Sequence, residues 1–174
     1  DKLSDLNKAA NKASKILGVS DLELLNYPDN RLDQIDRLDL IKCIEARVLK
    51  YKPNIIYTHH CGDVNIDHRR IHEAVVTASR PTPQNCVKKI LSFETLSSTE
   101  WATSSSFPQF NPNWFEDISK TRNLKIKALK AYASEMRQWP HPRSLKGINS
   151  LMQVRGATAG FNFAEAFVLG RLKN

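Results

Sequence analysis

The sequence has no hydrophobic run long enough to cross a membrane. Its longest apolar stretches, 54–58 and 161–169, fall well short of the roughly 20 residues that a membrane-spanning helix needs. The first residues also lack the basic-then-apolar pattern of a secretory signal. We therefore expect no membrane span and a cytoplasmic protein.

Cysteine is scarce as well. The three cysteines, at positions 43, 61 and 86, are odd in number, widely spaced and without a Cys-x-x-Cys pair. Such spacing does not fit a disulfide framework or a structural zinc knuckle. It indicates a reducing compartment.

Long blocks of like charge are also missing. The net charge of +8 suits an anionic partner, either nucleic acid or a phosphorylated small molecule. However, lysine and arginine are spread thinly along the chain, with no block of five or more. We interpret the charge as a solvated surface and expect no nucleic-acid partner; a homo-oligomer is left open.

Helical and strand patterns alternate along the 174 residues, a length that suits one compact core. Apolar spacing predicts helices over 4–17, from about Ile35 to the Lys52-Pro53 pair, and over 67–79, 124–136 and 144–155. Short apolar runs predict strands over 22–25, 54–58, 87–93, 114–118 and 163–169. The run 54–58 is apolar at consecutive positions, which is typical of a strand buried on both faces. The order predicts an α/β fold, a three-layer αβα domain with a mostly parallel sheet.

The most informative run follows the predicted strand 54–58. In ten residues it contains histidines at 59, 60 and 68, acids at 63 and 67, and an amide at 65. In open α/β sheets, ligands bind at the carboxyl ends of the strands. The run is therefore the first candidate for a functional site.

Two metal interpretations of this run fail on missing residues. Asp63, Asn65 and Asp67 match the first positions of a calcium loop, but that loop needs Gly and Glu where the chain has His68 and Ala74. A helical pair of histidines four apart, 68 and 72, resembles the clamp of zinc proteases. In that clamp, a glutamate directly after the first histidine acts as general base, and this sequence has Arg69 at that position.

Two other interpretations stay open at this point. In the first, Asp67 caps the following helix and the histidines are ordinary loop residues. In the second, His68 donates one imidazole nitrogen to a catalytic zinc, while Asp67 or Asp63 orients the site from behind.

Four stretches carry a resemblance to a known family. The segment YTHHCGDVNIDHRRIHEAV (57–75) resembles the second signature of the LmbE-like or PIG-L deacetylases, in which a strand ends in Thr-His and a loop leads to Asp-His at a helix start. KILGVSDLELLNYPDNRLD (15–33) is similar to the family's helix, strand and aspartate-bearing turn. RPTPQ (80–84) and VRGATAGFNFAEAF (154–167) extend the likeness to nearly the whole chain.

The resemblance implies a Rossmann-like αβα domain that binds one zinc ion, with other divalent ions left open, and removes the acetyl group from an N-acetylated sugar. The substrate would be a GlcNAc-type glycan, glycolipid or sugar conjugate, with a phosphorylated or nucleotide-linked form left open. In the family a His-Pro-Asp-Asp motif supplies two zinc ligands and the general base, and the histidine matching His68 is the third ligand.

That first motif is absent, because none of the five histidines is followed by Pro-Asp-Asp. By the family's layout, a first strand, helix and second strand should precede Asp1. We therefore expect residues 1–174 to be one LmbE-like deacetylase domain that is incomplete at its amino terminus and inactive as it stands. The alternative is a non-catalytic basic binding module or a degenerate relative of the same fold.

The resemblance also suggests roles around His68. Asp67 and Asp63 are expected to support the geometry of the site. Several family members have a histidine at the position of Asn65; an amide there can donate to an oxyanion but cannot supply a proton. The acid role then passes to His60, His59 or metal-bound water.

For the substrate, the resemblance points to the turn after 22–26. Asp29 matches the family's aspartate that binds sugar hydroxyls, and Arg31 suits a phosphate. A turn residue and a surface charge are the plain alternatives for these two positions.

Overall fold

The computed structural model describes residues 2–173 and groups them into two units. One comprises the chain up to Asn26 together with Phe115–Glu165; the other comprises Tyr27–Trp114 and the chain from Ala166 onward. We call them unit 1 and unit 2 and describe each by itself. The single-domain organisation expected from the length stays a prediction.

Unit 2 contains a strand-helix-strand motif. Strand β1 (Ile55–His59) leads through α3 (Ile66–Ala78) to β2 (Lys89–Phe93). The two strands run parallel, with Ile55 opposite Lys89 and His59 opposite Phe93. Because the strands are parallel, the loops that follow them emerge at the same edge of the sheet.

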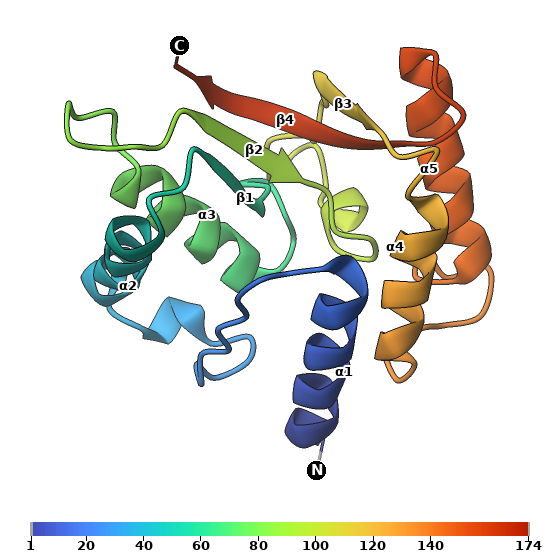
Figure 1. The fold of residues 1–174 in the computed structure, drawn as a ribbon, viewed down its shortest axis with the longest axis horizontal. Helices are drawn as coiled ribbons and strands as arrows, with labels where there is room; N and C mark the ends of the chain where they lie inside the picture. The colour runs from blue at the N-terminus through green and yellow to red at the C-terminus, as the bar shows by residue number, and fades with distance from the viewer. Residues whose placement is uncertain (1, 174) are drawn as a thin grey trace. The chain divides into compact units, whose positions relative to one another are not determined.

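The full sheet has the order β1-β2-β4-β3 (Figure 1). Strand β4 (Ala164–Leu172) pairs antiparallel with β2, and both β4 and β3 (Trp114–Asp117) run from one unit into the other. Helices alternate with these strands, which confirms the predicted α/β class.

Helix α2 (Arg37–Tyr51) packs against α3 to form the core of unit 2. Asp36 caps the start of α2 by accepting a hydrogen bond from the Leu38 N–H, and Lys52 ends it in the left-handed conformation just before Pro53. A first cluster of buried apolar side chains lies between the two helices and includes Leu32, Leu40, Ile41, Ala74 and Ala78. A second, formed by Val48, Val87 and Ile90, lies under the sheet.

Strand β1 is not buried on both faces, so that prediction is wrong. It lies at the edge of the sheet, and the side chains of Ile55 and Tyr57 are 42% and 51% exposed. Consecutive apolar residues record the hydrophobicity of a strand but not its place in the strand order.

Unit 1 is built from helices. Helix α1 (Lys2–Leu17) lies beside α4 (Arg122–Leu129), and a short turn η3 (Lys130–Tyr132) and α5 (Leu145–Ala159) follow. A largely apolar groove of about 550 Å³ is lined by both α1 and α4.

The helix predicted over 124–136 is shorter than expected. The backbone N–H groups of Glu135 and Met136 both donate to the Tyr132 carbonyl, so the chain turns there instead of continuing the helix. The apolar stripe predicts the period of the helix but not its end.

The strand predicted over 22–25 does not form within the described residues. The chain from Asp21 to Pro28 has neither helix nor strand, and Leu22, Leu24 and Leu25 are 38–44% exposed. A strand needs a neighbouring strand for its backbone hydrogen bonds, and β-prone side chains do not supply one.

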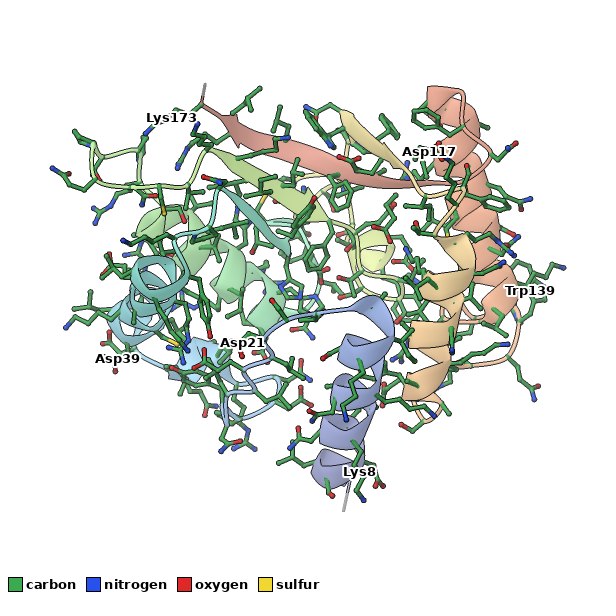
Figure 2. The ribbon with its side chains drawn as sticks, in the orientation of Figure 1. Lys8, Asp21, Asp39, Asp117, Trp139 and Lys173 are labelled. Atoms are coloured by element: carbon green, nitrogen blue, oxygen red, sulfur yellow. The ribbon has the colours of Figure 1, made fainter. Side chains whose placement is uncertain are left out.

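None of the helices in residues 2–173 is both long and apolar enough to cross a membrane. Charged side chains such as Lys8 and Asp39 project away from the ribbon into solvent (Figure 2). This surface agrees with the even spread of charge along the sequence.

Gly156 on α5 provides a test of the packing in unit 1. A Cβ atom there would lie 2.6 Å from the Phe161 carbonyl oxygen and 2.9 Å from the Phe163 nitrogen. We expect Gly156→Ala to lower the free energy of unfolding by about 1–3 kcal/mol, measured by urea denaturation. Gly170→Ala is the control, because its Cβ would meet Ile90 at an ordinary 3.7 Å. Equal stability of the two variants would contradict the close approach.

Candidate active site

The candidate site lies wholly in unit 2, where two chain segments meet. The first is the loop from His60 to Asn65 between β1 and α3, and the second is the segment after β2 that leads into η2 (Thr99–Trp101). Both follow parallel strands, so the sheet brings together residues about 35 positions apart in the sequence.

Asn65 sets the start of α3. Its side-chain Oδ1 accepts a hydrogen bond from the Asp67 N–H at 2.8 Å, a typical N-cap. The cap uses the oxygen of the amide, so Nδ2 is the group that Asn65 can offer to a ligand. This is consistent with the predicted role as an oxyanion donor.

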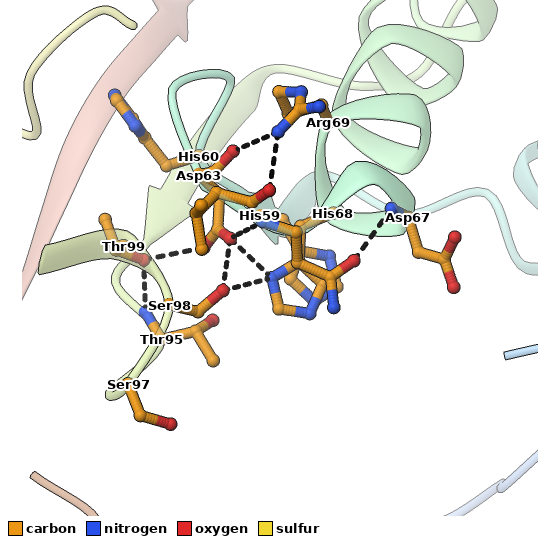
Figure 3. Close-up of polar contacts among 12 residues, drawn as sticks. His59, His60, Asp63, Asp67, His68, Arg69, Thr95, Ser97, Ser98 and Thr99 are labelled. Carbon is orange, nitrogen blue, oxygen red and sulfur yellow. Dashed lines mark hydrogen bonds and ion pairs between the residues drawn. The ribbon is translucent and has the colours of Figure 1, made fainter. Parts of the chain in front are cut away.

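Asp63 lies at the centre of the site and is fully buried. Its Oδ1 accepts hydrogen bonds from the Asn65 N–H at 2.8 Å and from the Ser98 hydroxyl, and its Oδ2 accepts one from the Thr99 hydroxyl at 2.8 Å (Figure 3). Burial raises the pKa of Asp63, but hydrogen bonds from His68, Ser98, the Asn65 N–H and Thr99 outweigh it and hold the pKa well below its usual range. Asp63 is therefore an ionised acceptor.

His68 faces this carboxylate. Its Nδ1 lies 3.1 Å from Asp63 Oδ1, and its side chain is 19% exposed. An ionised carboxylate can only accept, so Nδ1 carries the hydrogen between the two groups, and Nε2 is the ring nitrogen that Asp63 does not use. The pairing of a histidine with a carboxylate behind it is the arrangement that orients metal-ligating histidines.

His59 stacks on His68 with ring centroids 4.0 Å apart and an interplanar angle of 16°. Burial, followed by the charge of the neighbouring His68, lowers the pKa of His59 to about 4. A second histidine of α3, His72, contacts the His59 carbonyl oxygen through Nδ1 at 2.8 Å. His59 is thus a neutral ring packed against His68 at neutral pH.

His60 points away from His68 (Figure 3). It is 4% exposed, its Nδ1 accepts a hydrogen bond from the Gly62 N–H at 3.1 Å, and its ring meets Phe110 edge-on at 5.3 Å. Burial, and next the charge of His72, lowers the pKa of His60. The structure therefore separates His60 from His68, although the sequence placed both in one catalytic group.

Asp67 holds the predicted substrate turn. Its carboxylate points away from the His68 ring and accepts hydrogen bonds from the Asn30 and Leu32 N–H groups, at 2.7 and 2.9 Å (Figure 3). Asp29 and Arg31, the predicted substrate residues, are exposed on this turn. Asp67 therefore ties the turn to the first helical turn of α3, next to His68.

A covering segment, residues 107–110, packs on the loop before α3. A Cβ atom on Gly62 would lie 1.8 Å from the Pro108 carbonyl oxygen, so only glycine fits there. Arg69 donates to the carbonyl oxygens of Asp63 and Val64 at 2.7 and 2.8 Å, and its guanidinium lies over the Phe107 ring. These contacts fix the backbone that carries Asp63.

The described residues provide one suitable metal ligand but not a complete set of ligands for a metal centre. In residues 2–173 no group of three or more His, Cys, Asp or Glu side chains is placed to hold a metal ion. His68 by itself fits the requirement, since Nδ1 is paired with Asp63 and Nε2 has the chemistry of a zinc ligand.

Comparison with known proteins tests the family resemblance. Residues 3–79, which include the loop and α3, match the family described as PIG-L: GlcNAc-PI de-N-acetylase. The resemblance to the PIG-L family is confirmed. The chain is also similar to the uncharacterized deacetylase YaiS of Escherichia coli (strain K12). The two sequences are 29% identical over 140 residues, an alignment that covers 77% of this chain and 68% of YaiS.

Three solved structures share the fold. The conserved protein TT1542 from Thermus thermophilus superposes with a TM-score of 0.73 at 19% identity, covering 95% of this chain and 72% of its own. The N,N'-diacetylchitobiose deacetylase from Pyrococcus horikoshii gives 0.72 at 18% identity, covering 97% and 64%. Dbv21, the A40926 pseudoaglycone deacetylase, gives 0.68 at 14% identity, covering 100% and 73%. At these identities the likeness establishes the α/β fold.

Sequence reasoning missed Ser98 and Thr99, the two hydroxyl donors to Asp63. They lie in a stretch rich in serine and threonine, between the predicted strands 87–93 and 114–118, for which the apolar spacing predicts neither helix nor strand. The signal that could have found them is topological: they follow the strand that is parallel to β1.

The lowered pKa of Asp63 predicts an acid-sensitive contribution to stability. Because the folded pKa lies below the value of about 3.9 for an unfolded aspartate, this contribution is complete above that value and is lost as the pH falls below it. Between about pH 5 and pH 3, we expect wild type to lose about 1 kcal/mol more unfolding free energy than Asp63→Asn. Urea denaturation in the presence of chelator measures this.

The matched control is Asp33→Asn, an exposed aspartate of unit 2. Its stability should follow the wild-type dependence on pH. If Asp63→Asn does the same, the carboxylate of Asp63 is not preferentially ionised in the folded chain.

Proposed function

We propose that this chain forms part of a metal-dependent deacetylase that hydrolyses the acetamide of an N-acetylated sugar. One observation carries the proposal: in a segment that matches the PIG-L family, a buried ionised Asp63 fixes the ring of His68 with Nε2 available. The fold shared with two named deacetylases is consistent with it.

We assign the metal-ligand role to His68 Nε2, with zinc as the ion. Zinc bound at such a site acidifies water and acts as a Lewis acid toward a carbonyl oxygen. Asp63 stabilises the neutral Nδ1–H tautomer that this ligand needs, and the stacked ring of His59 restricts rotation of His68 from one side.

Asn65 is the proposed donor to the developing oxyanion. Its cap to Asp67 fixes the amide at the start of α3, three residues before His68, and leaves Nδ2 to donate. His60 is an unsuitable proton donor in this arrangement because its ring is buried against Phe110, away from His68. We therefore do not assign the role of general acid to His60, and we propose that another group supplies this proton.

The turn at Asp29 and Arg31 is the proposed sugar site. Both side chains are exposed, and Asp67 holds the backbone between them through the Asn30 N–H. A carboxylate accepts hydrogen bonds from sugar hydroxyls, and a guanidinium binds a phosphate in bidentate fashion. Names of relatives that mention GlcNAc and diacetylchitobiose support an N-acetylglucosamine-type substrate.

Loss of the His68 ring tests the metal role. In the protein that carries this chain, we expect His68→Ala to lower acetate release from N-acetylated sugars by more than about 100-fold, the upper range for losing an outer partner of a ligand. Bound zinc, measured by atomic emission, should fall in parallel. Chelation of wild type should abolish acetate release, and added zinc should restore it.

His141→Ala is the control for loss of an imidazole ring, since this histidine lies outside the chain segments that form the candidate site. It should keep both zinc and activity. A wild-type protein that binds no zinc and releases no acetate from any sugar of the panel would refute the proposed enzyme and favour a degenerate relative.

Asp29→Ala tests the sugar site. Removal of a charged hydrogen-bond partner should raise KM by about 10-fold with little change in kcat, because the lost contact is made to the bound sugar and not to the reacting amide. Asp33→Ala, on the same exposed segment, should leave KM unchanged. A fall in kcat at constant KM would move Asp29 from binding to catalysis. Steady-state kinetics with N-acetylglucosamine derivatives measures both constants.

A further inference from the structure

The segment after β2 forms a closed turn. The backbone N–H groups of Ser98 and Thr99 donate to the Thr95 carbonyl oxygen at 3.1 and 2.9 Å. The Glu100 carboxylate accepts from the Ser97 and Ser98 N–H groups at 2.6 and 3.2 Å. This turn fixes the backbone of two neighbouring hydroxyl side chains.

Both hydroxyls point at Asp63 (Figure 3). Thr99 Oγ1 accepts from the Thr95 N–H at 2.7 Å, so its own hydrogen is directed to Asp63 Oδ2 at 2.8 Å. The Ser98 hydroxyl donates to Asp63 Oδ1, and its oxygen also lies 3.5 Å from His68 Nδ1. Oδ1 is thus shared by Ser98, His68 and the Asn65 N–H.

Burying the Asp63 carboxylate with the hydroxyls of Ser98 and Thr99 costs free energy, which a purely structural role does not explain. Ser98 and Thr99 are each 7% exposed and Asp63 is fully buried, and apolar side chains of similar volume usually stabilise such a position at least as well. What an apolar replacement cannot provide is an oriented acceptor for the Nδ1–H of His68. Without the two hydroxyls, Asp63 keeps one backbone donor besides His68 itself.

We infer that Ser98 and Thr99 are positioning residues for His68, which act by holding the Asp63 carboxylate in one orientation against His68 Nδ1. Both hydroxyls donate to Asp63, so we assign them a positioning role and not a contact with the substrate. Their effect on catalysis rests on the deacetylase function proposed above, whereas their effect on the His68 ring does not.

The test uses Ser98→Ala, Thr99→Val and the double variant. Thr99→Ser is the conservative variant that keeps the hydroxyl. Ser97→Ala is the matched control, because Ser97 lies in the same turn and its side chain points away from Asp63 (Figure 3). Far-UV circular dichroism and thermal unfolding establish that each variant is folded.

The first measurement is the tautomer of the neutral His68 ring, from imidazole nitrogen NMR shifts of the metal-free chain at a pH above the titration of the ring. In wild type, Ser97→Ala and Thr99→Ser we expect hydrogen on Nδ1 and a lone pair on Nε2. In Thr99→Val and the double variant we expect the two tautomers to mix. A double variant that is folded and keeps the pure Nδ1–H form overturns the inference. If the double variant unfolds, the same criterion applies to the single variants.

The second measurement is kinetic, on the protein that carries this chain. We expect kcat of Thr99→Val to fall by about 10- to 100-fold with little change in KM, and Thr99→Ser to recover most of it. A change confined to thermal stability, with kcat and the tautomer as in wild type, would leave the hydroxyls a structural role and overturn the inference. If wild type releases no acetate, the proposed function fails, while the tautomer result still decides the positioning role.

Discussion

The site depends on the hydrogen bonds to the carboxylate of Asp63, which is ionised and has no access to solvent. Four donors satisfy it, and they come from the loop, from α3 and from the segment after β2. A buried charge that lost a donor would be strongly destabilised, so the three segments hold each other in place. Because the carboxylate only accepts hydrogen bonds, it also requires a hydrogen on Nδ1 of His68. The buried charge therefore determines that Nε2 is the ring nitrogen left for a ligand.

The sheet topology makes this arrangement possible. The carboxyl ends of β1 and β2 lie at one edge because the strands are parallel and are joined by α3. An antiparallel neighbour would have sent the second loop to the opposite edge. Gly62 and the covering segment 107–110 then close over the loop, and Arg69 holds its carbonyl groups, so the backbone around Asp63 has little freedom.

The sequence singles out the candidate site by its composition: three histidines and two acids lie within ten residues at the end of a strand. It could not assign partners. Asp67 precedes His68 directly, yet successive helical residues project about 100° apart, so the carboxylate that meets His68 comes from Asp63. Most helices and strands follow their apolar period, whereas the segment 22–25 and the exposure of β1 depend on which strands are neighbours. That information is not contained in a local pattern.

Asp67 joins two parts of the site that the sequence treats as separate. Its two carboxylate oxygens hold the backbone at Asn30 and Leu32, and its own N–H receives the cap from Asn65 one residue before His68. A shift of the turn that carries Asp29 and Arg31 must therefore either break these two hydrogen bonds or move the start of α3 with it. A single side chain thus links the turn proposed to bind a sugar with the helix that carries His68.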